Sequence, residues 1–210
     1  MLDFIIRRHS IRKFKDENIP DKDLIEIIKA ATLAPSGKNS QNWHFIVIKN
    51  RNKLNEIADI VKNKELKLSQ YIKDGIEKNK FISSIDNHIF FKDAPITVFV
   101  YAGPYPDNRK KILKNAKVAK EEIEEYINVE PRIQNIGAAM ENLLLAAANL
   151  GYGGCWMTGP MLAKKEIEEY IGFHKDGYSL VCMAPLGVPS ENEIISSTRK
   201  PIEEILTIID

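Results

Sequence analysis

The sequence has few cysteines and no long apolar run. Its 210 residues include two cysteines, Cys155 and Cys182, too few for a disulfide framework. This cysteine usage is typical of a reducing compartment, so we expect a cytoplasmic protein. The longest apolar run, from Leu143 to Ala148, is far shorter than the ~20 residues that span a bilayer. The start, Met-Leu-Asp, has no apolar stretch before a small-residue cleavage site, so we also expect no secretory signal.

An excess of one charge is also missing. Thirty Lys and Arg residues face 29 Asp and Glu residues, for a net charge of +1. A general nucleic-acid binder usually carries a broad basic excess, so that class is disfavoured. Neither a GxGxxG motif after an early strand nor a GxxxxGK[ST] motif occurs. The four histidines have no zinc-type spacing with the cysteines, and we expect no metal site.

Helical and strand patterns are interspersed along the chain. With 44% hydrophobic and 28% charged residues, residues 1–210 fit a single globular domain. Helical spacing of apolar residues predicts helices over 21–34, 52–80, 109–128 and 133–150. Short β-rich runs predict strands over 44–49, 96–101 and 178–189. We expect the last two strands to pair, which makes the fold class α/β (α+β).

A dense basic segment, "RRHSIRKF" at residues 7–14, contrasts with the neutral whole. It places four cations and a histidine around Ser10, with no carboxylate. A solvated surface patch is the simplest explanation, because runs of charge usually face water. The alternative is a phosphate site, since arginine forks bind phosphate in a bidentate manner. Arg199 and Lys200, near the other end of the chain, could contribute to the same place.

A second polar segment, "APSGKNSQNWHF", covers residues 34–45. It is rich in turn formers and in small side chains that donate and accept hydrogen bonds. It is either an ordinary helix-to-strand connection or a loop that binds a polar ligand. In the second case the backbone would approach the ligand closely at Gly37.

Four motifs in a fixed order carry a family resemblance. "RRHSIRKF", "LAPSGKNSQNWHFIVI", "IGAAMENLLLAAANLGYGGCW" and "MTGP" together resemble the FMN-dependent nitroreductase family, from residue 7 to about residue 200. The resemblance implies a mixed sheet flanked by helices, built as an intertwined homodimer. Two FMN molecules would lie in the dimer interface.

The resemblance also assigns residues to FMN binding. They are Arg8, His9, Ser10, Arg12, Pro35, Ser36, Gly37, Asn39, Trp156, Met157, Thr158, Gly159 and Arg199. By this assignment Arg8 and Arg199 hold the phosphate, and Arg12 lies near the pyrimidine edge of the flavin. A backbone N–H at Thr158–Gly159 would point at flavin N5.

Other implied contacts come from both subunits. His9 and Ser10 would line the phosphate and ribityl end, while residues 35–39 would reach the flavin from the partner subunit. Two departures from the family pattern stand out. Asn42 in "SQNW" replaces a common proline, which we expect to change loop stiffness more than chemistry. Phe90 or Phe91 stands where some members place a lysine, so flavin electrostatics would rest more on Arg12.

The implied activity is transfer of hydride from NADH or NADPH, through flavin N5, to a small acceptor. Nitroaromatics, quinones and activated alkenes fit, by a ping-pong mechanism in which no side chain needs to be a catalytic nucleophile. The alternatives are other flavin chemistry on the same scaffold, such as ene reduction, dehalogenation or flavin cleavage, and a non-catalytic FMN-binding or storage protein. The segment 102–131, broken by Gly103, Pro104 and Pro106, is the expected lid that would select the acceptor.

Overall fold

A computed structural model describes residues 3–127, 130–190 and 198–209. Its centre is a four-stranded antiparallel sheet in the order β1-β2-β4-β3. The strands are β1 (Trp43–Ile48), β2 (Ile96–Ala102), β3 (Gly153–Gly154) and β4 (Ser179–Gly187). One parallel bridge joins Ser10 to Gly154 at the β3 edge. The predicted pairing of β2 with β4 is confirmed.

Helices surround this sheet. They are α1 (Asp3–Arg7), α2 (Asp21–Thr32), α3 (Arg51–Ser69), α4 (Gly75–Ser83), α5 (Asp86–Ile89), α6 (Arg109–Asn115), α7 (Lys120–Ile127), α8 (Pro131–Asn149) and α9 (Lys164–Ile171). Short 3₁₀ helices are η1 (Gly37–Asn39), η2 (Phe90–Asp93), η3 (Gly159–Ala163) and η4 (Ile202–Glu204). The helix predicted over 52–80 is two helices, because the Asp74 side chain caps a new one by accepting from the Glu77 N–H. The sequence also did not predict α5 and α9.

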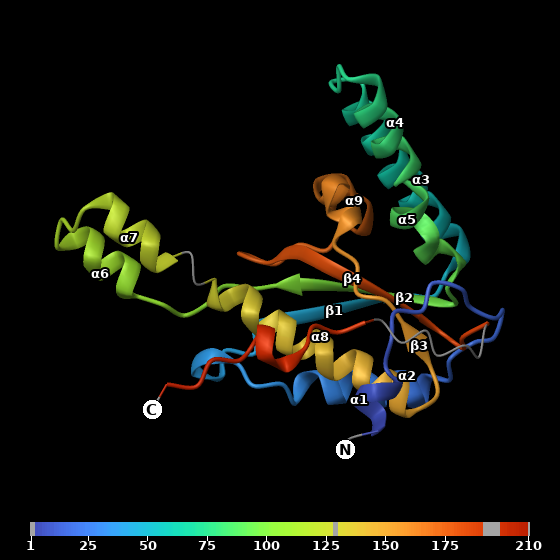
Figure 1. The fold of residues 1–210 in the computed structure, drawn as a ribbon, viewed down its shortest axis with the longest axis horizontal. Helices are drawn as coiled ribbons and strands as arrows, with labels where there is room; N and C mark the ends of the chain where they lie inside the picture. The colour runs from blue at the N-terminus through green and yellow to red at the C-terminus, as the bar shows by residue number, and fades with distance from the viewer. Residues whose placement is uncertain (1–2, 128–129, 191–197, 210) are drawn as a thin grey trace.

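The sheet is covered on both faces (Figure 1). Helices α2 and α8 lie on one face, and α3, α5 and α9 lie on the other. Strand β2 shows why: Val98 and Val100 pack into the α2–α8 core, while Phe99 and Tyr101 pack into the α3–α9 core. Successive side chains of a strand point to opposite faces, so a wholly apolar strand needs cover on both. None of the described helices is long and apolar enough to cross a membrane.

A helical hairpin, α6 with α7, projects from the body at the left of Figure 1. It is shorter than the lid predicted over 102–131. Ala102 still belongs to β2, where it pairs with Trp43 of β1. The Gly103 N–H donates to the Asn42 carbonyl at 2.6 Å. Pro131 already begins α8. The projecting part is therefore 109–127, which we call the α6–α7 hairpin.

Candidate functional site

The basic segment lies along the edge of the sheet, beside the glycine-rich turn at 151–154. The Ile11 N–H donates to the Gly154 carbonyl at 2.9 Å, and the Lys15 N–H donates to the Val188 carbonyl at 2.9 Å. These backbone bonds fix residues 10–15 in an extended path between the turn and the end of β4. Side chains of this segment are thereby presented to the residues that follow Gly154.

The basic side chains gather around Cys155. Burial raises the pKa of the Cys155 thiol, while Arg12, a hydrogen bond with Ser10, and Arg8 act in the opposite direction. Three predicted site residues therefore lie near one thiol directly before Trp156. Arg8 also lies over α8, where its Nε is 3.7 Å from Oε1 of Glu141. The basic side chains thus lie near the 155–159 segment and near α8.

His9 contains an unpaired polar atom within this cluster. Its Nδ1 donates to the Arg7 carbonyl at 2.9 Å, which fixes the ring. Its Nε2 is buried and has no hydrogen-bond partner among the described residues. Buried polar atoms are rarely left unpaired, so this atom fits a group that binds there. With Nδ1 protonated, a neutral ring accepts at Nε2, as from a ribityl hydroxyl, and a charged ring donates, as to a phosphate.

The segment 156–159 alternates between exposed and buried side chains. Trp156 and Thr158 are exposed, whereas Met157 is buried in the α3–α9 core. The Met157 backbone bonds in both directions to Met183 of β4, at 2.8 and 3.0 Å. The segment therefore runs as an extra strand-like edge. A ligand on its outer side would meet Trp156, Thr158 and backbone atoms, but not the Met157 side chain.

The loop 35–42 is held by a network of amide side chains. Asn135, in α8, accepts from the Gly37 N–H at 3.0 Å and donates to Asn42 Oδ1 at 2.7 Å and to Ser40 Oγ at 3.0 Å. Asn42 donates in turn to the carbonyls of Gly103 and Arg132, both at 3.2 Å. Asn42 and Asn135 are 2% and 6% exposed, so water cannot replace these bonds.

The same loop holds strained backbone. Lys38, Asn39 and Gln41 have φ values of 56°, 49° and 42°, in the left-handed region that favours glycine. Such conformations cost on the order of 1 kcal/mol or more each and persist where the surroundings determine them. Here the hydrogen bonds of Asn135 hold the loop in these conformations. Pro35, Gly37 and Asn39 remain exposed, and Ser36 is half-buried.

The predicted residues other than Arg199 fall into two groups within one chain. The loop 35–42 precedes β1 at one edge of the sheet, and the basic segment joins β3 at the other edge. Both flank α8, where Asn135 and Glu141 are six residues apart, or about 9 Å along the axis. Arg199 lies in the described tail 198–209 and is exposed, with a hydrogen bond to the Thr198 carbonyl at 3.3 Å.

Comparison with known proteins identifies the fold and the family. Residues 5–188 match the profile described as "Nitroreductase family". This chain belongs to the nitroreductase family. The resemblance of its motifs to that family is confirmed, and so is the mixed α/β fold.

The names of similar proteins indicate different functions. A BluB-like flavoprotein from Clostridium difficile is 40% identical, with a TM-score of 0.93, over 99% of this chain and 98% of its own. A protein of Archaeoglobus fulgidus described as an NADH dehydrogenase/NAD(P)H nitroreductase is 31% identical over 74% of this chain, which is 66% of that relative's length. An iodotyrosine deiodinase of Hydra vulgaris is 26% identical over 97% of this chain and 70% of its own length.

FMN is present in a structural neighbour with lower identity. A Bacteroides fragilis nitroreductase with bound FMN has a TM-score of 0.71, over 100% of this chain and 98% of its own. Its sequence identity is 22%, so it supports the fold of this nitroreductase-family chain and no finer assignment.

Several residues of this nitroreductase-family site were not found from the sequence. Asn42 was expected to alter stiffness more than chemistry, yet it is a buried junction between the loop, β2 and α8. Asn135 is a polar residue on the buried side of an apolar helix, a signal that could have drawn attention to it. Tyr105 packs on Gly37, and a methyl group there would lie 2.6 Å from its hydroxyl oxygen.

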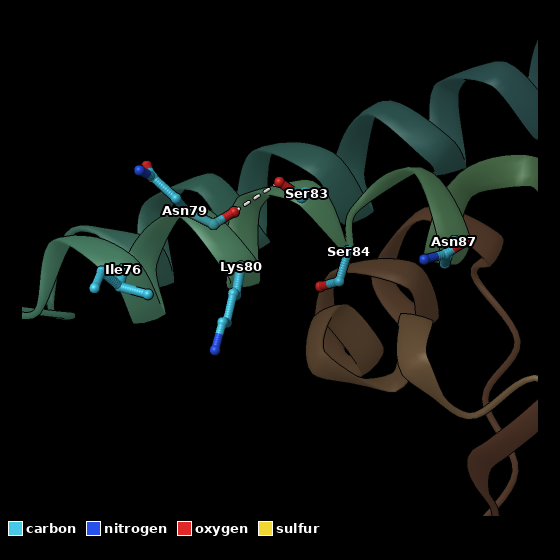
Figure 2. Close-up of a pocket in the computed structure, with 6 residues that line it drawn as sticks. All are labelled: Ile76, Asn79, Lys80, Ser83, Ser84 and Asn87. Carbon is cyan, nitrogen blue, oxygen red and sulfur yellow. Dashed lines mark hydrogen bonds between the residues drawn. The ribbon is translucent and has the colours of Figure 1, made fainter.

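A hollow of about 500 Å³ lies along α4 and α5 (Figure 2). Its lining residues are Ile76, Asn79, Lys80, Ser83, Ser84 and Asn87. Lys80 and Ser84, one helical turn apart, point to the same side of α4 and its end. Asn87 directly precedes His88, whose ring packs against Gly159.

Proposed function

We propose that this protein is an FMN-dependent oxidoreductase that passes hydride from NADH or NADPH to a small electrophilic acceptor. The observation that carries the proposal is the backbone pairing of the basic segment with Gly154, which places Arg8, Ser10 and Arg12 near the segment that begins at Cys155. A flavin phosphate and an anionic reduced flavin both require local positive charge, whatever the net charge of the protein.

The residues present fit FMN. The unpaired Nε2 of His9 is a buried atom that a ribityl hydroxyl or the phosphate would satisfy. Arg8 and Arg199 are the proposed phosphate ligands, and Arg12 is the proposed neighbour of the pyrimidine edge. The exposed side of 156–159 offers an indole, a hydroxyl and backbone groups to a planar ring.

FMN, when bound, supplies the hydride-accepting N5 atom and the two-electron chemistry. The protein's part is to bind and orient. The N–H at Thr158–Gly159 would donate toward N5, and Arg12 would stabilise negative charge on the pyrimidine ring. A single stacking position used in turn by nicotinamide and acceptor gives ping-pong kinetics.

We also propose that the active unit is a homodimer with composite sites. The tail carries five large apolar side chains that are each more than half exposed: Ile202, Ile205, Leu206, Ile208 and Ile209. Ile5 and Ile6 of α1 are about half exposed as well. Apolar surface gathered on two terminal segments is typical of an interface. The loop 35–39 would then complete the partner's flavin site.

Colour is the first test. The purified protein should be yellow, release FMN on denaturation, and bleach with NADH or NADPH without oxygen. A colourless protein that does not take up added FMN would refute the proposal. A yellow protein that neither nucleotide bleaches would instead be an FMN-binding or storage protein.

The phosphate ligands have a matched control. Arg8→Ala and Arg199→Ala should each weaken FMN binding about tenfold or more, the loss of one charge-assisted contact. Arg7→Ala, at an exposed neighbouring position, should leave it unchanged. Riboflavin, which lacks the phosphate, should bind weakly to the parent and respond to neither change. Equal FMN affinity in all variants would refute the phosphate assignment.

Mixed dimers test the composite site. Arg8→Ala and Asn39→Ala chains, refolded together, should form heterodimers with one undamaged site and one doubly damaged site. FMN binding should then partly recover. Proven heterodimers without recovery, or a monomer that stays yellow in sizing chromatography, would reject the shared site.

Reductive dehalogenation is the second candidate function. The supporting observation is the similarity, over 97% of this chain, to a Hydra protein named iodotyrosine deiodinase. A screen that offers halogenated phenols beside nitroaromatics and quinones to the reduced protein separates the two. Halide release that outpaces nitro and quinone reduction would favour dehalogenation.

A further inference from the structure

A buried carboxylate lies behind His88, whose ring contacts the 156–159 segment. Glu65, in α3, is 0% exposed and sits among apolar residues of the α3–α9 core. A charge in such a place is costly unless it is paired and hydrogen-bonded. One oxygen, Oε1, is 2.8 Å from Nδ1 of His88, and the other, Oε2, has no partner among the described residues.

The imidazole of His88 connects this carboxylate to the segment. His88 lies in the short helix α5, and its side chain is 26% exposed. A methyl group placed on Gly159 would lie 2.4 Å from its Cδ2 and 2.6 Å from its Nε2. The ring edge therefore occupies the space beside the Gly159 α-carbon, and only a glycine fits there.

Glu65 determines how this ring lies. When Glu65 is ionised, its Oε1 can only accept, so Nδ1 of His88 then carries the proton and the ring plane is set. The opposite edge, Cδ2 with Nε2, then faces Gly159. A buried carboxylate that orients an imidazole is a common way to hold a ring in one tautomer and one direction.

We propose that Glu65 and His88 are a positioning pair that sets the Thr158–Gly159 peptide toward the flavin. The proposal rests on the proposed function, because it takes that peptide N–H as the donor to N5. His88 acts through Gly159, and Glu65 acts through His88. Displacement of the ring would turn the peptide and weaken the bond that stabilises the reduced flavin.

Simple packing explains the arrangement less well. A pair that served stability alone could be replaced by apolar residues of similar volume, often without loss. The His88 ring fills a space that an apolar ring could also fill. An apolar ring would lack the hydrogen bond to Glu65, which holds the edge of the His88 ring in one place.

A double-mutant cycle between His88 and Gly159 tests the contact. Gly159→Ala should push the ring away, lower kcat on the order of 10- to 100-fold and shift the absorption maximum and reduction potential of bound FMN. His88→Ala should cause a smaller change of the same kind. The double variant should approach His88→Ala alone, because the space for the methyl group then exists. Additive losses would overturn the contact.

Glu65 has conservative and disruptive variants. Glu65→Gln keeps an oxygen acceptor and should retain most of the potential and kcat, whereas Glu65→Leu should resemble His88→Ala. Glu166→Gln is the matched control, because this carboxylate of α9 bonds Lys64 of α3 at 2.5 Å and also has a buried, unpartnered oxygen. It should alter the melting temperature without changing the flavin spectrum or potential.

A flavin-free measurement separates the two proposals. In the apo protein, ¹⁵N spectra should show His88 protonated at Nδ1, and Glu65→Leu should abolish that preference. A parent protein that binds no FMN would refute the proposed function and leave this ring state measurable. A yellow parent whose Glu65→Leu and His88→Ala variants change only in melting temperature would overturn the positioning role alone.

Discussion

The loop 35–42 and the α6–α7 hairpin are both polar, yet the structure holds them in opposite ways. The loop is short, strained at three residues, and tied by a buried amide network to β2 and α8. The hairpin is longer and highly charged, and α6 buries no residue. Ile123 of α7 is buried, at 4% exposure.

The segment that leads into the hairpin makes a small contact with the loop. Tyr105 packs on Gly37, and Lys38 Nζ donates to the Pro106 carbonyl at 2.7 Å. The start of the hairpin segment therefore rests on the fixed loop. From this difference we predict that the loop matters more for cofactor binding and the hairpin more for the choice of acceptor.

The largest effect should come from removing the loop's support. Asn135→Leu leaves the Gly37 N–H without its partner and removes the 2.7 Å bond to Asn42 Oδ1, at about 1–3 kcal/mol for each polar group left buried and unpaired. FMN affinity should fall at least a hundredfold, beyond the loss from a single phosphate contact. Asn142→Ala, on the same helix with a bond to the Ala30 carbonyl, should retain FMN. Fluorescence titration of FMN measures both, and equal affinities would show that the network does not hold the loop.

The second effect should come from separating the loop from Tyr105, in the segment that leads into the hairpin. Gly37→Ala places a methyl group 2.6 Å from the Tyr105 hydroxyl, so the ring or the loop must shift. We expect a several-fold weaker FMN affinity, and a return toward the parent value in the Gly37→Ala/Tyr105→Ala double variant. Gly75→Ala, with nothing within 4 Å, is the control. Failure of the double variant to recover would place the damage in the loop itself.

A third change sharpens the division of roles. Replacing residues 109–127 by a short Gly-Ser linker, with Tyr105 and Pro106 kept, should leave FMN affinity within about threefold, which is under 1 kcal/mol. Relative kcat/KM values for a nitroaromatic, a quinone and a halogenated phenol should change much more. Loss of FMN with acceptor preference retained would mean that the hairpin is part of the core.

The smallest effect should come from the hairpin surface. Lys120 and Glu124 form an exposed i,i+4 ion pair at 3.4 Å in α7. Lys120→Ala should cost about 0.3–0.5 kcal/mol of unfolding free energy, screened by salt, with FMN affinity unchanged. Thermal unfolding at low and high ionic strength measures this. A loss comparable to that of Asn135→Leu would contradict the comparison.

Local patterns along the sequence determined much of this protein. Helical spacing located α2 and α8, the β-branched run located β2, and the ordered motifs identified the family, because each of these signals lies in neighbouring residues. The basic cluster at 7–14 was equally visible, and it does lie along the sheet edge beside Cys155. Helix boundaries were less certain, since a single Asp74 cap divides one long pattern into α3 and α4.

The tertiary structure alone decided which polar residues meet. Asn42 and Asn135 bond across 93 positions of sequence, and no local pattern predicts that pair. The same holds for Glu65 with His88, and for the ring of His88 against Gly159. Met157 points inward because the backbone bonds to Met183 fix its side in the sheet. Such contacts depend on how two apolar layers pack on a twisted sheet. The free energy that selects this packing comes from contacts throughout the core, so no single segment of the sequence determines it.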